Sequence, residues 1–179
     1  LPTRAHSALG YAGLRRAHRY VHEAIADPEL RCLVDGLWDE AADVLARETV
    51  DIAAYRAALL TRFGNPALPH ALKQIAADGS QKLAPRLLST FEERAALGLE
   101  SPAIASVMAA WAQALRDIDG LSDPMHDRLV SIVRSGAAPT TLFEQLLQTI
   151  TPGRAPLSGL IEQSATAWLR SAMLDHRAS

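Results

Sequence analysis

The sequence predicts an all-α fold, with one globular multi-helix domain of about nine helices. Three observations predict it. Apolar residues recur at three- and four-residue intervals along nearly the whole chain, and alanine and leucine dominate among them. The β-branched and aromatic residues never gather into an alternating strand pattern, and short breaks with helix-capping residues separate the periodic segments.

The breaks place the helices in order. Helix starts are expected where an acceptor side chain precedes a proline, because the side chain can cap and proline suits the first helical position. These pairs are Asp27-Pro28, Asn65-Pro66, Ser101-Pro102 and Asp123-Pro124. Further starts are expected at Asp51, between Leu83 and Pro85, and at Thr141, where Glu144 completes a capping box. The resulting helices span about 5–26, 28–47, 51–63, 66–77, 84–97, 102–118, 124–135, 140–150 and 156–176.

Length and linkers indicate one domain. The 179 residues are enough to bury a core without disulfides, and the longest linkers, 98–101, 136–139 and 151–156, are too short to separate domains. No repeat of fixed period is present, which argues against a helical solenoid. We therefore treat 1–179 as a single helical domain. Because the helical pattern is already under way just after Leu1, we expect the chain to begin inside a larger protein.

Charge and hydropathy exclude several partners. The net charge of −2 provides no general attraction for nucleic acid or an anionic membrane. No apolar run approaches the roughly 20 residues of a membrane span, and no charged-then-apolar leader opens the chain. We expect a soluble, cytoplasmic protein that binds neither nucleic acid nor membrane.

Several conspicuous residues are expected to be structural. Cys32, the only cysteine, follows an apolar helical pattern and is expected to be buried rather than nucleophilic. The tryptophans have apolar neighbours at helical spacing, which favours the core over a ligand site; they are Trp38, Trp111 and Trp168. The adjacent carboxylates Asp39-Glu40 and Glu92-Glu93 point about 100° apart on a helix, which suits solvent exposure better than a shared acid/base site.

A metal site is not expected. His18 and His22 stand at i and i+4, a spacing that lets two imidazoles share one metal ion on a helix face. Arg19 lies between them, and no cysteine, histidine or well-placed carboxylate provides a third ligand. The pair is better interpreted as part of a solvated polar face.

Two polar segments are candidates for a site. Thr3 and His6, at i and i+3, project from the same face of the opening helix. The segment 75–83 (IAADGSQKL) is a polar break in which Gly79 is expected to take the left-handed conformation that closes a helix. By itself this break is either a C-cap followed by an N-cap or a loop from which Lys82 serves a ligand.

Together these segments resemble the C-terminal domain of the mannitol dehydrogenase family, the polyol-specific long-chain dehydrogenases that include fructuronate and tagaturonate reductases. The resemblance covers most of the chain, most specifically at 78–82 (DGSQK). The segments that carry it are 6–11 (HSALGY), 21–24 (VHEA), 26–28 (ADP), 37–40 (LWDE), 55–56 (YR), 62–66 (RFGNP) and 74–83 (QIAADGSQKL).

The resemblance implies a two-domain enzyme. An N-terminal Rossmann-type domain, absent from this chain, binds NAD or NADP, and the helical domain closes over it with the polyol or ketose in the cleft. No metal is used. Hydride is transferred between a sugar alcohol and a ketose, and the isolated chain is expected to be inactive and to bind NADH only weakly.

The resemblance also implies site residues. In the family, a lysine acts as general base, an asparagine stands five residues later, and a histidine follows three residues after that. His6 matches the histidine, Thr3 stands where the asparagine is expected, and the lysine would fall just before the first residue of the chain. Lys82 matches a substrate-side lysine, and Gln74, where some members carry arginine, is expected to face the same cleft.

The threonine is a departure from the family pattern. A hydroxyl lacks the paired donor and acceptor of an amide, so either the polyol contact is altered or Thr3 is not the native residue. Two other functions remain open from the sequence. One is a helical ligand-sensing or dimerisation domain without catalysis. The other is a separate gene product derived from the family and now acting only as an interaction protein.

Overall fold

The computed structural model describes residues 2–44 and 51–177, and these residues are helical with no strand. The all-α prediction is confirmed. The elements are α1 (Pro2–Arg15), α2 (Val21–Ala26), α3 (Pro28–Ala42), α4 (Ile52–Phe63), α5 (Leu72–Ile75), α6 (Gly79–Leu83), the π-helical turn η1 (Ala84–Leu88), α7 (Ser89–Ala96), α8 (Pro102–Asp117), α9 (His126–Val133), α10 (Pro139–Ile150) and α11 (Ser158–Arg177). No helix in the described ranges is long and apolar enough to cross a membrane.

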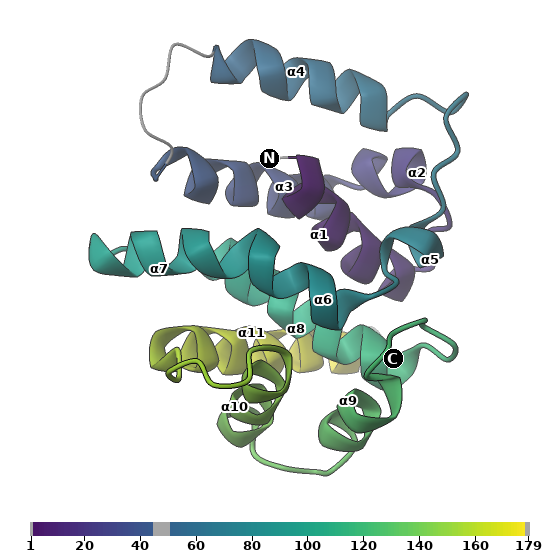
Figure 1. The fold of residues 1–179 in the computed structure, drawn as a ribbon. Helices are drawn as coiled ribbons and strands as arrows, with labels where there is room; N and C mark the ends of the chain where they lie inside the picture. The colour runs from purple at the N-terminus through teal and green to yellow at the C-terminus, as the bar shows by residue number, and fades with distance from the viewer. Residues whose placement is uncertain (1, 45–50, 178–179) are drawn as a thin grey trace.

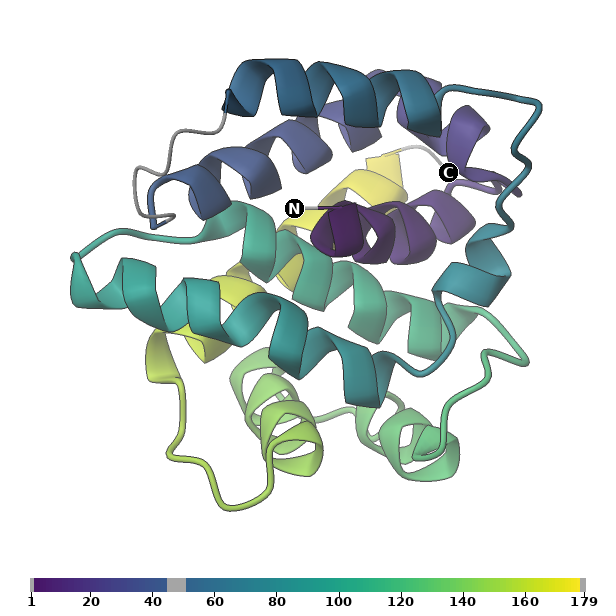
Figure 2. The same ribbon diagram turned by 45° about the horizontal axis from the view of Figure 1, so that its top comes forward.

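Helix α8 is the centre of the molecule. It packs against α1, α3, α9 and α11, and α6, η1 and α7 follow one another as one continuous rod (Figure 1). Figure 2 shows α1 between α3 and α8, with α4 at the outer edge. Twelve of the sixteen residues of α8 are buried, and Trp111 lies near its middle. Trp38 and Trp168 are also buried, so the core assignment of all three tryptophans is confirmed.

The prediction of one helix over 5–26 is wrong, because two helices, α1 and α2, occupy this stretch. Helix α1 ends in a Schellman motif, in which His18 N donates to Gly13 O at 3.0 Å and Ala17 N donates to Leu14 O at 3.0 Å. Ala17 takes the left-handed conformation at φ 62°, a position that glycine usually fills. Since an alanine stands there, the sequence carries no signal for this turn.

The predicted helix 66–77 is also wrong. Only α5 is helical, and Asn65 does not cap a helix; its Oδ1 accepts from Ala67 N at 2.9 Å in an Asx turn. Pro69 would interrupt any helix that spanned this stretch, because it lacks a backbone donor. The loop is tied instead to the α1–α2 corner, where Val21 N donates to His70 O at 3.0 Å.

The caps are partly as predicted. Asp27 accepts from Glu29 N at 2.9 Å and Asp51 accepts from Ala54 N at 3.0 Å, so both N-caps are confirmed. The expected start between Leu83 and Pro85 is wrong. The helical rod begins at Gly79, and Pro85 lies inside η1, where the wider π-turn contains a residue that has no N–H to donate.

The other predicted starts are displaced or capped differently. Helix α9 begins at His126, because the Asp123 carboxylate accepts from Met125 N and closes a turn first. Helix α10 begins at Pro139, so Thr141 is not its cap. Helix α8 starts as predicted after Ser101, but that hydroxyl does not cap it.

The cap of α8 comes from Glu40 on α3, which was expected to be exposed. Its carboxylate is buried and accepts from Ala103 N at 2.6 Å and from Ile104 N at 3.0 Å. Burial raises the pKa of Glu40, although these two hydrogen bonds act in the opposite direction. The expectation for Asp39 holds, because it is solvent-accessible.

The structure also bears on two further predictions, those for Cys32 and for the pair His18 and His22. Cys32 is exposed, so the prediction that it is buried is wrong; it occupies the outer side of α3. His18 lies 3.2 Å from Asp27 through Nε2, and His22 stacks on Tyr20. Within the described residues, no group of three candidate ligands is arranged to hold a metal ion.

Candidate substrate-side site

The N-terminal half of α1 presents one stripe of residues to its neighbours. Thr3, His6, Ser7 and Gly10 lie on this stripe, because residues three and four apart share a helix face. A Cβ on Gly10 would lie 3.1 Å from Ile75 Cγ2 and 3.4 Å from the Ala76 nitrogen. The missing side chain therefore lets α5 approach α1 directly.

Arg86 connects the same stripe to the α6–η1 rod. Its Nη1 donates to Ser7 Oγ at 2.9 Å and to Thr3 O at 3.4 Å, while its own carbonyl accepts from Arg4 Nε at 2.6 Å. Lys82 stands one helical turn before Arg86 on the rod. The guanidinium of Arg86 therefore joins η1, the turn that follows the 75–83 segment, to the α1 stripe.

The loop that leads into α6 is fixed at both ends. Asp78, not Gly79, takes the left-handed conformation, at φ 57°, so the expectation for Gly79 is wrong. Asp tolerates that conformation better than most residues. Asp78 N donates to Ser122 O at 2.8 Å, and the Asp123 carboxylate accepts from Ser80 N at 2.8 Å and from Ser80 Oγ at 2.6 Å.

Gly79 has a different role, which is close packing. A Cβ there would lie 2.6 Å from both Trp111 Nε1 and the Tyr11 hydroxyl oxygen. Tyr11 is on α1, so the glycine also places the loop against the helix that carries His6. Burial raises the pKa of Tyr11 far above its ordinary value, and the phenol is therefore protonated at neutral pH.

Lys82 turns back toward its own loop. Its Nζ donates to Ala77 O at 2.8 Å and lies 3.4 Å from Asp78 Oδ2. The side chain is 30% exposed. An ammonium group has three donors, so one remains for a ligand.

His6 is half-buried beside an open cavity of about 490 Å³. Its ring centroid lies 4.8 Å from that of Phe63, at an interplanar angle of 56°, and 5.6 Å from that of His70. The cavity is lined by His6, Val21, Arg62, Phe63, Ala67, Leu68, Pro69 and His70.

The structure therefore places the four predicted site residues as follows. Thr3 and His6 share the α1 stripe, and α5, which carries Gln74, packs against α1. Lys82 lies on α6, which continues into η1, the turn whose Arg86 donates to Ser7 on α1. Gln74 is exposed on α5 and its side chain makes no hydrogen bond to another described residue. The ammonium of Lys82 bonds within its own loop.

Sequence reasoning missed two residues of this region. Arg86 lies at i+4 from Lys82, a spacing that identifies it as a neighbour on the same helix face. His70 carries no such signal, because its position beside His6 depends on how the irregular 64–71 loop folds back over α1.

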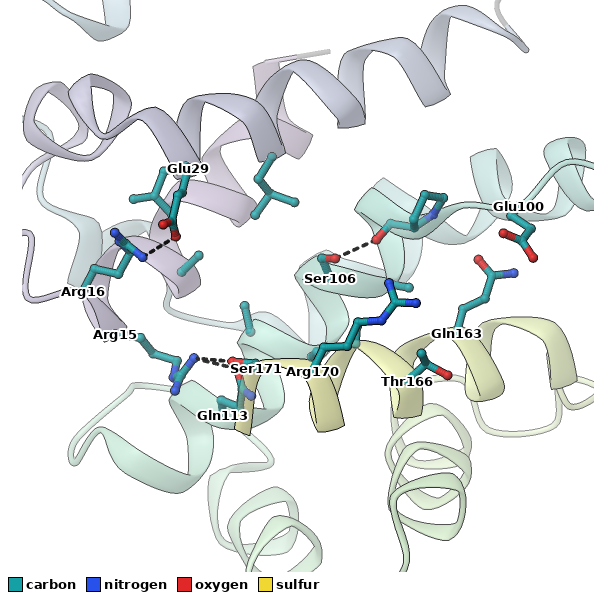
Figure 3. Close-up of a pocket in the computed structure, with 18 of the residues that line it drawn as sticks. Arg15, Arg16, Glu29, Glu100, Ser106, Gln113, Gln163, Thr166, Arg170 and Ser171 are labelled. Atoms are coloured by element: carbon teal, nitrogen blue, oxygen red, sulfur yellow. Dashed lines mark hydrogen bonds and ion pairs between the residues drawn. The ribbon is translucent and has the colours of Figure 1, made fainter. Parts of the chain in front are cut away.

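A second, larger cavity of about 840 Å³ lies at the other end of α1, between α1, α3, α8 and α11 (Figure 3). Its floor includes small residues of α8, namely Ala105, Ala109 and Ala110. The two arginines at the end of α1 are engaged within the chain: Arg15, the last residue of α1, donates from Nη1 to Gln113 Oε1 at 2.7 Å, and Arg16, in the turn that follows, pairs with Glu29. None of the four predicted site residues lines this cavity.

Comparisons with known proteins identify the family of this chain. Residues 3–151 match the family model described as mannitol dehydrogenase C-terminal domain. The chain is 31% identical over 150 residues to the uncharacterised oxidoreductase YdfI of Escherichia coli K12, covering 80% of this chain and 31% of that protein. It is 33% identical over 133 residues to a mannitol 2-dehydrogenase of Phaeosphaeria nodorum, covering 70% of this chain and 23% of that protein.

Solved structures share the fold. A ternary complex of Pseudomonas fluorescens mannitol 2-dehydrogenase with NAD and D-mannitol superimposes with a TM-score of 0.81 at 28% identity, covering 99% of this chain and 39% of the other. A substrate-free D-sorbitol dehydrogenase superimposes with a TM-score of 0.80 at 22% identity, covering 97% of this chain and 37% of the other.

The fold and the family match define this chain as a helical C-terminal domain of the type found in mannitol dehydrogenases. The chain spans less than half the length of the relatives that it matches. It belongs to the mannitol dehydrogenase C-terminal domain family.

Proposed function

We propose that this chain is the substrate-side domain of an NAD(P)-dependent polyol dehydrogenase, which interconverts a sugar alcohol and a ketose by hydride transfer. One observation carries the proposal. Arg86, one helical turn after Lys82, donates to Ser7 Oγ and to Thr3 O on the α1 stripe, which supports a single site formed by the two polar segments. The family match favours this function over a ligand-sensing or dimerisation domain.

Each site residue has a chemical role in the proposal. The His6 imidazole donates a hydrogen bond to the reacting oxygen and so polarises it. Phe63 covers one side of the imidazole and limits its access to water. The free donor of Lys82 and the amide of Gln74 bind hydroxyls of the polyol, and the Thr3 hydroxyl provides a single contact where relatives use an amide.

In this proposal the general base is a lysine that this chain does not contain. The family pattern places this lysine five residues before the position of Thr3. That lysine would accept the hydroxyl proton while His6 holds the oxygen.

In this proposal the dinucleotide site lies outside the described residues. They contain no strand, so they provide no strand–loop–helix turn on which a pyrophosphate could be bound. NAD or NADP, bound by a Rossmann domain outside this chain, would accept the hydride. A relative of similar fold forms a ternary complex with NAD and D-mannitol, which supports this arrangement.

The test is to join the chain to its upstream half and to measure polyol-dependent NAD reduction. We expect His6→Ala to lower the rate by two to four orders of magnitude, the range typical of a lost acid/base group. His126→Ala is the matched control, because this imidazole lies on α9, away from the α1 stripe. An equal rate in His6→Ala would remove that assignment, and no reduction with any polyol would overturn the function.

A binding measurement tests the division between the domains. We expect the chain alone to bind NADH with a dissociation constant above the millimolar range, since its described part lacks the cofactor crevice. Submillimolar binding by the 179-residue chain would contradict the proposal.

A further inference from the structure

Helix α11 forms one wall of the larger cavity and runs parallel to α8, which forms the floor. Just before α8, Ser101 N donates to Gln163 Oε1 at 2.8 Å, and toward the other end of α8, Ser171 Oγ donates to Gln113 Oε1 at 3.4 Å. The two helices therefore follow the cavity in the same direction. The alanines of the floor leave the space between α3 and α11 open (Figure 3).

The cavity has an acidic end and a basic end. Glu162 precedes Gln163 and lines the cavity with Glu100, near the start of α8. Arg170 precedes Ser171 and lines the opposite end. Glu162 and Arg170 are exposed, and neither forms an ion pair with another described residue. Because a helix rises about 1.5 Å per residue, their separation of eight positions corresponds to about 12 Å.

The outer face of α11 carries these two charges together with apolar side chains. Glu162, Thr166, Arg170 and Met173 recur at spacings of three and four residues, so they share one helix face, which we call the α11 ridge. All four are exposed. Met173, at 70%, is the most exposed large apolar side chain of the described residues, and Leu169 beside it is 52% exposed. The α11 ridge therefore offers both charge and apolar area to a partner.

The order of charges on the α11 ridge is antisymmetric about Thr166. Glu162 lies four residues before Thr166, and Arg170 lies four residues after it. In a two-fold interface, residue i of one copy contacts residue j of the other, and j contacts i. Two α11 helices that cross antiparallel at Thr166 therefore place each glutamate opposite the arginine of the other copy. The threonine is small enough for the helices to approach closely at the axis.

We infer that the larger cavity and the α11 ridge form an interface between two copies of this protein. The α11 of each copy lies antiparallel along the cavity of the other, with both Thr166 residues at the two-fold axis. Pairs of Glu162 and Arg170 close the two ends, and Leu169 and Met173 are removed from water. A second copy fits this surface because it carries the complementary charges at the same spacing of eight residues. The interface lies at the other end of α1 from the candidate substrate-side site, so it does not depend on the proposed chemistry.

Sedimentation velocity tests the inference on the 179-residue chain and on the chain joined to its upstream half. We expect both proteins to show a monomer–dimer equilibrium between low micromolar and millimolar concentration. Added salt should weaken the dimer, because the charge pairs at the rim of the interface are screened.

Charge reversal tests the two-fold pairing. Glu162→Arg and Arg170→Glu should each weaken the dimer at least about tenfold, because like charges then face each other across the interface. An equimolar mixture of the two variants should dimerise like the parent, since every pair between unlike copies then joins opposite charges. Arg128→Glu is the matched control, because it reverses an exposed arginine on α9 and should leave the dimer unchanged. Circular dichroism checks that each variant is folded.

Crosslinking tests the position of the axis. In a Cys32→Ser background, Thr166→Cys should give a disulfide-linked dimer with oxidised glutathione, because the two copies of this position meet at the axis. Thr61→Cys, at an exposed position on α4, is the control and should stay monomeric.

Three results would overturn the inference. One is a monomer at every concentration. Another is a dimer that neither charge reversal weakens, or that the mixture of the two variants does not restore. The third is a dimer of the 179-residue chain that disappears when the upstream half is joined, because the rest of the protein then occupies the cavity. Polyol turnover by the joined protein is a separate measurement, so failure of the proposed function leaves this result unaffected.

Discussion

Gly79 and Trp111 approach each other so closely that a Cβ on the glycine would lie 2.6 Å from the indole Nε1. This close contact explains the glycine in the polar break. A left-handed turn does not explain it, because Asp78 and not Gly79 takes the left-handed conformation. The glycine opens α6 directly after the strained Asp78, so the loop, the core tryptophan and the start of the rod are coupled.

The first prediction concerns this contact. Gly79→Ala should lower the free energy of unfolding by about 1–3 kcal/mol, because overpacking moves either the indole or the loop. Chemical denaturation followed by circular dichroism measures the change. Gly159→Ala is the control, since its Cβ would lie 3.4 Å from Phe91 Cζ, an ordinary contact, and helix propensity should then stabilise the protein by up to about 1 kcal/mol. Equal effects in both variants would show that the contact with Trp111 is not tight.

The second prediction concerns the cap of α8. Glu40→Ala leaves the buried amides of Ala103 and Ile104 without their acceptor, and we expect a loss of about 2 kcal/mol in the free energy of unfolding. Asp39→Ala is the neighbouring control. It removes only the ion pair with Arg56, in which the Asp39 side chain is 70% exposed, and should cost less than about 1 kcal/mol. An unchanged free energy of unfolding in Glu40→Ala would mean that water replaces the carboxylate as the acceptor for these amides.

Periodicity and capping chemistry were enough to predict the fold class and most helices. The start of α8 is an example, because Pro102 is a strong local signal for the first helical position. Its cap was not predictable, because the acceptor comes from Glu40, 63 residues away in the sequence. In the sequence, the adjacent carboxylates of Asp39 and Glu40 both look solvent-exposed. Only the packing of α3 on α8 reveals that Glu40 is buried.

The same limit applies to the site. The resemblance to the family selected Thr3, His6, Gln74 and Lys82 from the sequence, and these assignments stay predictions. What the sequence lacks is the long-range arrangement around them. Arg86 reaches back to Ser7 across 79 residues, and His70 meets His6 only through an irregular loop, so neither contact follows from helical spacing.

The third prediction separates binding from stability at Lys82. Its ion pair with Asp78 is partly exposed, so Lys82→Met should change the free energy of unfolding by less than about 1 kcal/mol. In the chain joined to its upstream half, the KM for the polyol should rise at least tenfold, because a donor to the substrate is lost. Lys73→Met, at an exposed position on α5, is the control and should alter neither quantity. A stability loss with an unchanged KM would reassign Lys82 to a structural role.

The last prediction concerns acid stability through Asp27, the N-cap of α3. Burial alone would raise the pKa of Asp27, but hydrogen bonds from His18, Arg16 and the amides of Glu29 and Leu30 outweigh burial and lower the pKa to about 2. The folded state therefore binds the proton less tightly than the unfolded state. The stabilisation is present in full above the unfolded pKa of 3.8 and is lost as the pH falls through about 2.

Asp27→Asn removes this titration while keeping an oxygen that can still cap the helix. At pH 7 the variant should be less stable than the parent by about 1–2 kcal/mol, because the hydrogen bonds from Arg16 and His18 lose their charged acceptor. The difference in stability between the parent and the variant should narrow as the pH is lowered from 4 toward 2, because the unfolded parent and then the folded parent take up a proton at Asp27. Urea unfolding at a series of pH values measures it. A gap that stays constant over that interval would show that the Asp27 carboxylate titrates with its ordinary pKa in the folded protein.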